Sequence, residues 1–190
     1  MNYEEKLIDF LKSNMTELGF RLWNAINNRL PSVWEKLSSS SKKYHRKAEG
    51  YVPSIAEHTY EMLFAASKLI KMFNINPRTQ EADVIYYSIA FHDSLKYGVD
   101  GNLDHTISEH DKLAGDMIAT NIETFKKVLT EVQVKLLEDS VRYHSGQWST
   151  DAKGTNFNFK DRDPIAMFIH MLDMLSTVDL IKIPKEDIKQ

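Results

Sequence analysis

Apolar residues recur every three or four positions through nearly all of this chain, and runs that alternate apolar with polar residues are scarce. A repeat of about 3.6 residues is the period of an amphipathic helix, whereas a half-buried strand repeats every two residues. The pattern therefore predicts an all-α protein, a bundle of about seven or more helices around a shared core.

Two helices are predicted before Pro31, because proline cannot continue a helix and ends the second one. Residues 38–53 are polar, contain Gly and Pro, and are predicted to form a loop. A chain of 190 residues is long enough to bury its own core, so we expect one domain over residues 1–190. Residues 1–37 are expected to pack on a functional core of about 44–180.

Further helices are predicted downstream of this loop. Ser54 with Glu57 three residues later is a capping-box arrangement, which predicts a helix from Ser54 to about Phe73. The remaining helices are expected over residues 79–96, from Thr106 or Ser108 to about 118, over 131–144, and from Pro164 onward, where proline takes its preferred first helical position.

Composition narrows the class of protein. The chain has a net charge of -3, so nothing favours duplex nucleic acid or an acidic membrane as a partner. It contains no cysteine, which excludes disulfides and thiolate metal sites and fits the cytoplasm. We find no secretory signal and no apolar run long enough to cross a bilayer, so a soluble cytoplasmic protein is expected.

Residues with metal-binding side chains are spread along separate predicted helices. They are His58, the adjacent pair His92 and Asp93, His110, His144 and Asp173. Imidazole nitrogens and carboxylate oxygens suit divalent transition metals, and side chains borne on five segments can converge only in the middle of a bundle. A single histidine on an apolar helix is more often a hydrogen-bonded core residue, but the ordered set favours a metal centre. We interpret His105 as a loop residue and His170 as a structural histidine.

The order H…HD…H…H…D resembles the HD-domain superfamily of metal-dependent phosphohydrolases, especially its dinuclear members. The resemblance is carried by the segments EHTYEML, AFHDSLKYG, SEHDKLAGDMI, VRYHSGQW and IHMLDMLST, and extends from about Tyr44 to about Leu180. It implies an HD-domain helical bundle that holds two divalent metal ions, drawn from Mn, Fe, Co, Ni, Mg or Zn. It also implies that Asp93 bridges the two ions. His58, His92 and Asp173 would then complete one site, and His110 and His144 the other.

Two catalytic residues follow from the same comparison. Paired divalent ions bind a phosphoester oxygen and lower the pKa of a water molecule between them, and Asp93 is expected to orient that water. Lys96 follows Asp93 by three residues on the same helical face and is expected to contact the substrate phosphate. The segment HDSLK resembles the HDxGK of the family, although Leu95 stands where the family has glycine.

Further substrate-binding residues are predicted on both sides of the metal-binding segments. KKYH, which ends at His45, looks like a motif in a phage and bacterial branch of the superfamily, and its basic charge suits a substrate with several phosphates. Arg142, Gln147 and Trp148 flank His144 and are candidates for the non-phosphate part of the substrate. The Trp148 ring is suited to stacking on a nucleobase.

Three functions remain open from the sequence. The first is hydrolysis of a phosphoester of a small molecule, in particular a nucleotide. The second is a diiron HD-domain oxygenase, which would use the same ligands to activate O₂. The third is a non-catalytic HD-domain module that binds a nucleotide or a protein, and the complete ligand set disfavours it. The sequence makes no prediction of the oligomeric state.

Overall fold

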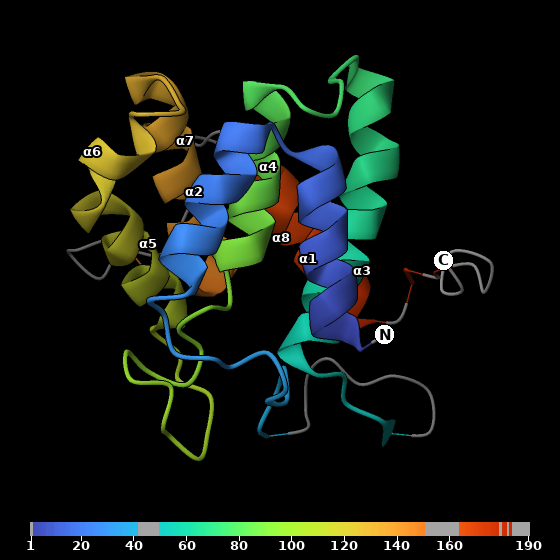
Figure 1. Cartoon of the computed structure of the whole chain (residues 1–190). Coiled ribbons are helices and arrows are strands. Elements are labelled where there is room, and N and C mark those ends of the chain that lie inside the picture. The colour runs from blue at the N-terminus through green and yellow to red at the C-terminus, as the bar shows by residue number, and fades with distance from the viewer. Residues whose placement is uncertain (1, 42–49, 151–163, 179, 182, 184–190) are drawn as a thin grey trace.

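The computed structural model describes residues 2–41, 50–150, 164–178, 180, 181 and 183, and within these ranges it is a helical bundle without strands (Figure 1). The all-α prediction is therefore confirmed. The helices are α1 (Tyr3–Asn14), α2 (Glu17–Asn27), α3 (Ile55–Leu69), α4 (Gln80–Phe91), α5 (His110–Thr120), α6 (Ile122–Phe125), α7 (Glu131–Arg142) and α8 (Pro164–Thr177), with short 3-10 turns η2 (Ile70–Phe73) and η3 (Gly146–Trp148).

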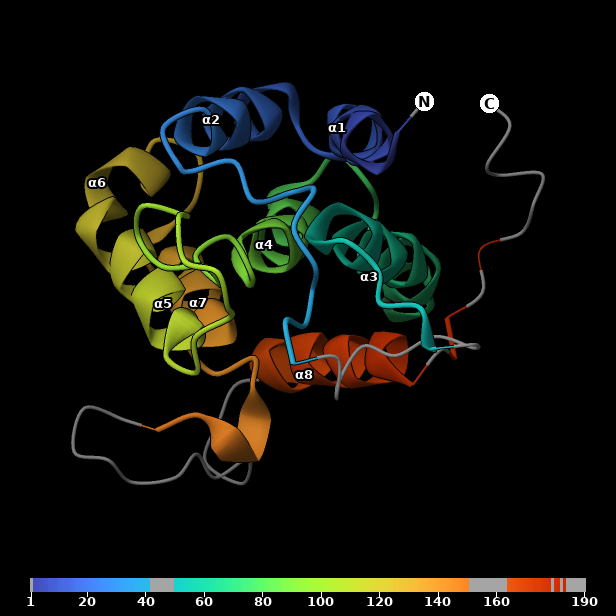
Figure 2. The ribbon, with the colours of Figure 1, turned by 90° about the horizontal axis from the view of Figure 1, so that it is seen from below.

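Helix α4 lies at the centre of the bundle. Seen from below, α1 and α2 cover one side of it, α3 a second, α8 a third, and α5 with α7 the fourth (Figure 2). Every residue of α4 from Ala82 to Phe91 is buried, and Tyr87 and Phe91 pack against Phe125 of α6. The C-terminal end of α4, at Phe91, is itself buried. The next two residues, His92 and Asp93, therefore lie in the interior of the molecule.

Side-chain caps set several helix starts, and of the two caps predicted by name, the one at Ser54 is confirmed. Ser54 accepts a hydrogen bond from the backbone N–H of Glu57 and caps α3, and Thr79 caps α4 in the same way through Ala82. The predicted cap of α5 by Thr106 or Ser108 is wrong, because the N-cap residue is Glu109 and no side chain caps this helix. The chain instead enters α5 through a backbone contact from Ile107 N–H to the carbonyl of Lys96.

Helix lengths differ from the sequence prediction mainly at their C-terminal ends. The helix predicted to reach Phe73 ends at Leu69 and continues as the 3-10 turn η2, which Asn74 terminates in the left-handed conformation. The helix predicted to reach Lys96 ends at Phe91, and residues 92–97 form tight turns. The short helix α6 was not predicted. In the part of the chain that is described, no helix is long and apolar enough to cross a membrane.

Asp83 joins the N-terminal helices to the centre of the bundle. This fully buried carboxylate accepts hydrogen bonds from the backbone N–H and the hydroxyl of Thr16, the residue that caps α2. Tyr87, one turn further along α4, donates to the carbonyl of Gly19 at 2.7 Å. The N-terminal helices are thus held on α4 by buried polar contacts as well as by apolar packing.

Candidate metal centre

The six predicted ligands come together in the interior. His58 lies in the first turn of α3, His92 and Asp93 follow α4, and His110 begins α5. His144 follows α7, and Asp173 lies in α8. The five residues other than Asp173 are buried, and the side chain of Asp173 is 15% exposed. Chain segments more than a hundred residues apart therefore contribute to one site.

Asp93 stands between two groups of imidazoles. Its Oδ2 lies 3.4 Å from His92 Nε2 and 3.9 Å from His58 Nε2. Its Oδ1 lies 3.2 Å from His110 Nε2 and 3.7 Å from His144 Nε2. Asp173 Oδ1 completes the first group at 3.1 Å from His58 Nε2. The six side chains thus form two adjacent clusters that share one carboxylate.

Contacts behind the rings fix which nitrogen carries the proton. The Nδ1 atoms of His92, His110 and His144 lie 2.6 to 2.8 Å from the carbonyl oxygens of Ile89, Ile107 and Val141. A carbonyl oxygen can only accept, so each of these Nδ1 atoms must donate its N–H. In the neutral ring the lone pair then lies on Nε2, the atom that faces the cluster.

His58 also carries its proton on Nδ1, and here a serine accepts it. Ser176 of α8 donates its hydroxyl proton to Glu61 at 3.0 Å, and its oxygen lies 2.9 Å from His58 Nδ1. Because the serine proton is directed to the carboxylate, the serine oxygen accepts the N–H of His58. Ser176 and Glu61 are both buried. This chain of contacts orients the His58 ring and makes its Nε2 more basic, as carboxylates behind metal-bound histidines do.

The directed lone pairs favour a cation between the rings. His58 Nε2 and His92 Nε2 are 3.1 Å apart, and so are His110 Nε2 and His144 Nε2. Two lone pairs that face each other at this distance repel unless a proton or a metal ion lies between them. Within the described residues, Asp93 Oδ1 is also buried without a hydrogen-bond donor.

The spacing of the donors fits metal coordination. Two donors that each lie about 2.1 Å from one ion are about 3.0 Å apart at a right angle and about 3.4 Å apart at the tetrahedral angle. The shortest separations within the clusters, 3.1 to 3.4 Å, fall in this range. His58, His92 and Asp93 form one set of donor atoms within 4.8 Å of each other, and Asp93, His110 and His144 form another. These buried groups could hold a metal ion.

The electrostatics of the centre keep His58, Asp93 and His144 in their metal-binding forms. Burial alone would lower the pKa of His92, but Asp93 and Asp173 outweigh it and raise this pKa, so a metal would have to displace a proton there. Burial lowers the pKa of His144 to about 3, helped by repulsion from His92 and His110, and burial also lowers the pKa of His58. Burial alone would raise the pKa of Asp93, but Lys96 and the surrounding imidazoles outweigh it and hold this pKa well below its usual range. Neutral imidazoles and an ionised carboxylate are the states that bind metals.

Lys96 connects the metal centre to a cavity. Its ammonium donates to Asp93 Oδ2 at 2.6 Å, and its side chain is 10% exposed. It is one of the residues that line a cavity of about 820 Å³, together with His110, His144 and Asp173. The lining also includes the hydroxyl-bearing residues 38–41, Thr106 and Ser108. A ligand in this cavity would therefore lie against three of the six clustered side chains, His110, His144 and Asp173, and against the lysine.

The predicted substrate-binding residues differ in whether they line the cavity. Trp148 lines the cavity with a ring that is 62% exposed. Arg142 is not among the residues that line this cavity: its guanidinium is held in ion pairs with Asp116 and Glu138, at 2.7 and 3.1 Å. Its side chain packs against Gly115 and ties α7 to α5, which is a structural role.

Gln147, in the same turn as Trp148, is exposed and is not among the residues that line the cavity. His45 lies outside the described residues. His170, interpreted as structural, does donate its Nδ1–H to the carbonyl of His144 at 2.7 Å, but it lines the cavity as well. His105, expected in a loop, is found in one at the cavity edge.

Sequence reasoning missed Ser176 and Glu61. Each follows a predicted ligand by three residues, Ser176 after Asp173 and Glu61 after His58. Residues at this spacing share a helix face, so both could have been predicted from the sequence pattern. It also missed the buried contact from the Ser149 hydroxyl to Asp111, at 2.6 Å, which fixes the end of the Trp148 turn beside α5.

No protein-family model matches the chain, and searches of curated proteins and of solved structures give no significant match. Function is therefore inferred from the chemistry of the site itself.

Proposed function

We propose that this protein is a metal-dependent phosphohydrolase of the HD-domain type, which hydrolyses a phosphoester of a small molecule, with a nucleotide as the favoured substrate. The observation that carries the proposal is the position of Asp93. One of its oxygens faces His58 and His92 and the other faces His110 and His144, at 3.2 to 3.9 Å. This arrangement supports a carboxylate shared between two divalent ions.

The donor set divides between the two proposed ions. His58, His92 and Asp173 would hold one together with Asp93 Oδ2, while His110 and His144 would hold the other with Oδ1. When bound, a pair of divalent ions supplies an ionised water as nucleophile and neutralises charge on the phosphoryl oxygens.

The remaining chemistry belongs to the protein. The Nδ1 contacts keep the Nε2 lone pairs directed at the centre, so the donor geometry is formed before a substrate arrives. Lys96 uses one of its three N–H donors on Asp93 and has others for an anionic substrate at the cavity wall. The exposed ring of Trp148 offers a surface for a planar base.

A metal-reconstitution assay tests the proposal. Purified protein is stripped with a chelator, reloaded separately with Mn, Fe, Co, Ni, Mg or Zn, and incubated with a panel of nucleotides while phosphate and pyrophosphate are measured. We expect turnover with at least one metal and a loss of at least about 100-fold in Asp93→Asn, because removal of a group needed for charge stabilisation costs that much. Asp100→Asn, at an exposed position, is the matched control and should retain activity.

Two results would contradict the proposal. One is the absence of phosphate release with every metal and nucleotide in a protein that binds metal. The other is equal activity in Asp93→Asn and wild type. Oxygen uptake by the iron-loaded protein without phosphate release would instead favour the diiron oxygenase.

A further inference from the structure

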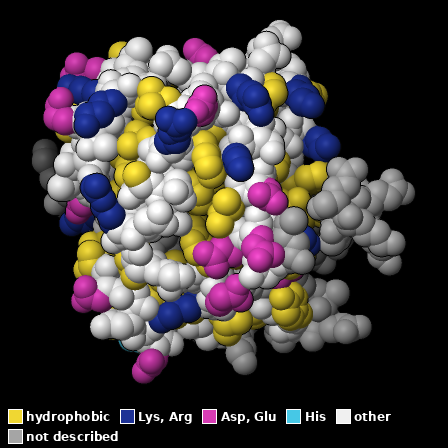
Figure 3. All heavy atoms as spheres, in the orientation of Figure 1, with side chains coloured by type: hydrophobic (Ala, Val, Ile, Leu, Met, Phe, Trp, Pro, Cys, Tyr) yellow, Lys and Arg dark blue, Asp and Glu magenta, His cyan; other side chains and the backbone are white. Residues whose placement is uncertain are grey.

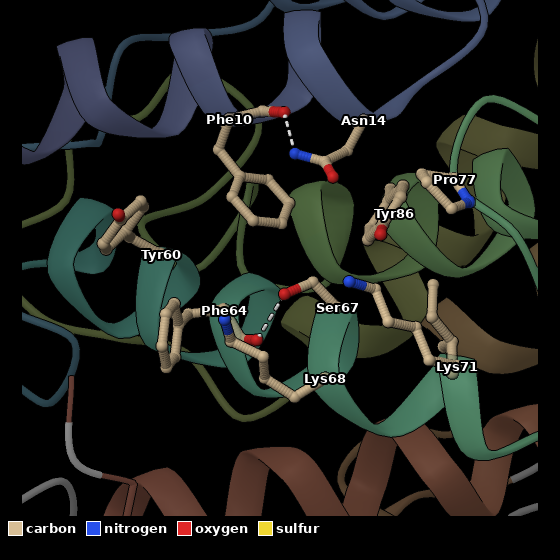
Figure 4. A pocket seen from close by; sticks show the side chains of 10 residues that line it. Phe10, Asn14, Tyr60, Phe64, Ser67, Lys68, Lys71, Pro77 and Tyr86 are labelled. Carbon is tan, nitrogen blue, oxygen red and sulfur yellow. Dashed lines mark hydrogen bonds between the residues drawn. The ribbon is translucent and has the colours of Figure 1, made fainter. Parts of the chain in front are cut away.

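A second pocket lies on another side of the bundle and shares no residue with the metal-centre cavity. It has a volume of about 290 Å³ and is formed by α1, the C-terminal half of α3 with η2, and the middle of α4. Figure 4 shows it from close by, with Phe10 directed into it from α1, Tyr60 and Phe64 on α3, and Tyr86 on α4. The proposed function uses none of these residues.

Tyr86 brings an unpaired donor to this pocket. Its side chain is fully buried, and among the described residues its hydroxyl has no hydrogen-bond partner. Burial raises the pKa of Tyr86 to about 12, with Asp83 contributing, so the hydroxyl keeps its proton at neutral pH. A buried hydroxyl without a partner is costly, and a ligand bound in the pocket that Tyr86 lines would supply the missing acceptor.

The charge around the pocket is positive. Lys68 and Lys71 both line it, and Lys71 makes no ion pair with a described carboxylate. In Figure 4 the end of the Lys71 side chain is directed toward the same space as the Tyr86 hydroxyl. In Figure 3 lysine and arginine side chains lie over α3 and the adjoining end of α1, as well as over other parts of this face, and several acidic side chains lie lower on it. An anion is thus the complementary ligand.

The rest of the wall is aromatic. Phe10 packs edge-on against Tyr60 and Tyr86, with ring centroids 6.2 and 5.6 Å apart. Phe64 lines the pocket beneath the ammonium of Lys68, which lies 4.8 Å from its ring centroid. Aromatic side chains favour a ligand with a planar ring. Any nucleobase can stack on them, because stacking does not depend on the hydrogen-bonding groups of the base.

We infer that this pocket binds a small phosphate monoester with a planar ring, of the size and class of a nucleoside monophosphate. The phosphate would accept from the Tyr86 hydroxyl and the Lys71 ammonium, and the base would lie among Phe10, Tyr60 and Phe64. A volume of about 290 Å³ is at the lower limit for ligand sites and suits a monophosphate better than a triphosphate. Lysine is a common phosphate ligand because its charge is compact.

Calorimetric titration of the full-length protein with AMP, GMP, CMP, UMP and inorganic phosphate tests the inference. We expect saturable binding of at least one nucleoside monophosphate at one site in the presence of EDTA, which keeps metal out of the other cavity, and at least about tenfold tighter than phosphate alone. Tyr86→Phe and Lys71→Gln should each weaken binding about tenfold or more, because each removes a hydrogen bond to a charged group. Lys127→Gln, at an exposed lysine far from the pocket, should have no effect.

Several results would overturn the inference. They are no saturable binding of any of the four nucleotides in EDTA, phosphate binding as tight as nucleotide binding, and equal weakening in Lys127→Gln and Lys71→Gln. The melting temperature of ligand-free Tyr86→Phe gives a separate test. It should equal or exceed that of wild type, since the variant loses only an unpaired hydroxyl, and a clear decrease would show that the hydroxyl already has a partner.

Discussion

Ser176→Ala tests whether the contacts behind His58 prepare it to bind a metal. The substitution removes the hydroxyl that joins His58 Nδ1 to Glu61, at 2.9 and 3.0 Å, and leaves all six proposed ligands in place. Loss of such an outer partner weakens metal affinity by about 10- to 100-fold. We therefore expect one metal equivalent to bind about 10- to 100-fold more weakly, while the second keeps most of its affinity.

Stability provides a second measurement on the same variant. Removal of a buried hydroxyl that bonds two buried groups lowers the free energy of unfolding by about 1 to 3 kcal/mol. For a domain of this size each kcal/mol changes Tm by about 2 to 4 °C, so the metal-free variant should melt roughly 2 to 12 °C below wild type. Ser88→Ala is the matched control, because Ser88 is equally buried but donates only to the carbonyl of Val84 within α4.

Competition with a fluorescent chelator measures the affinity, and calorimetry measures Tm. We expect Ser88→Ala to lose some stability and no metal affinity. If Ser176→Ala melts lower than wild type but binds both metal equivalents as tightly, the hydroxyl supports the fold alone. The reasoning about His58 orientation would then be refuted.

Three further predictions concern other parts of the molecule. Lys96→Gln should destabilise the metal-free protein by about 3 to 5 kcal/mol in urea unfolding, because Asp93 would be buried without its ion-pair partner, and added manganese should narrow the difference. Gly146→Ala should lower metal affinity in the chelator assay. Gly146 has a φ of 65°, and an added Cβ would meet the ring of His170, which donates to the carbonyl of the proposed ligand His144. Gly115→Ala should cost about 1 to 3 kcal/mol without changing metal affinity, because its Cβ would lie 2.7 Å from that of Arg142, and a neutral result would contradict the α5–α7 packing.

The helices, and the convergence of the six side chains, could be predicted from the sequence. The apolar period placed His58, Asp93 and Asp173 on different helices, and only a bundle interior can bring such residues together. The cap residue Ser54 also lies where its type predicts. Membership of the HD-domain superfamily, the number of ions and the reaction stay predictions.

The direction of individual side chains was not within reach. Arg142 is two residues before His144, and nothing in the local sequence shows that Gly115 leaves space for it beside α5. The wall of the main cavity is likewise formed by residues 38–41 and Thr106, which adjoin the site only through tertiary contacts such as the one between the hydroxyls of Ser40 and Thr106. Spacing along a chain predicts helix faces, whereas cavities depend on how those faces pack.

The burial of α4 has a consequence for how the protein would be regulated in a cell. Its C-terminal end carries His92 and Asp93 into the most protected part of the molecule, so the binding groups are assembled only in the native state. An ion with affinity for that state alone shifts the folding equilibrium by mass action, by about 2.7 kcal/mol at a hundredfold excess over its dissociation constant. If the proposed ions bind, the supply of free metal would thus govern the lifetime of the polypeptide against proteases as well as its chemistry.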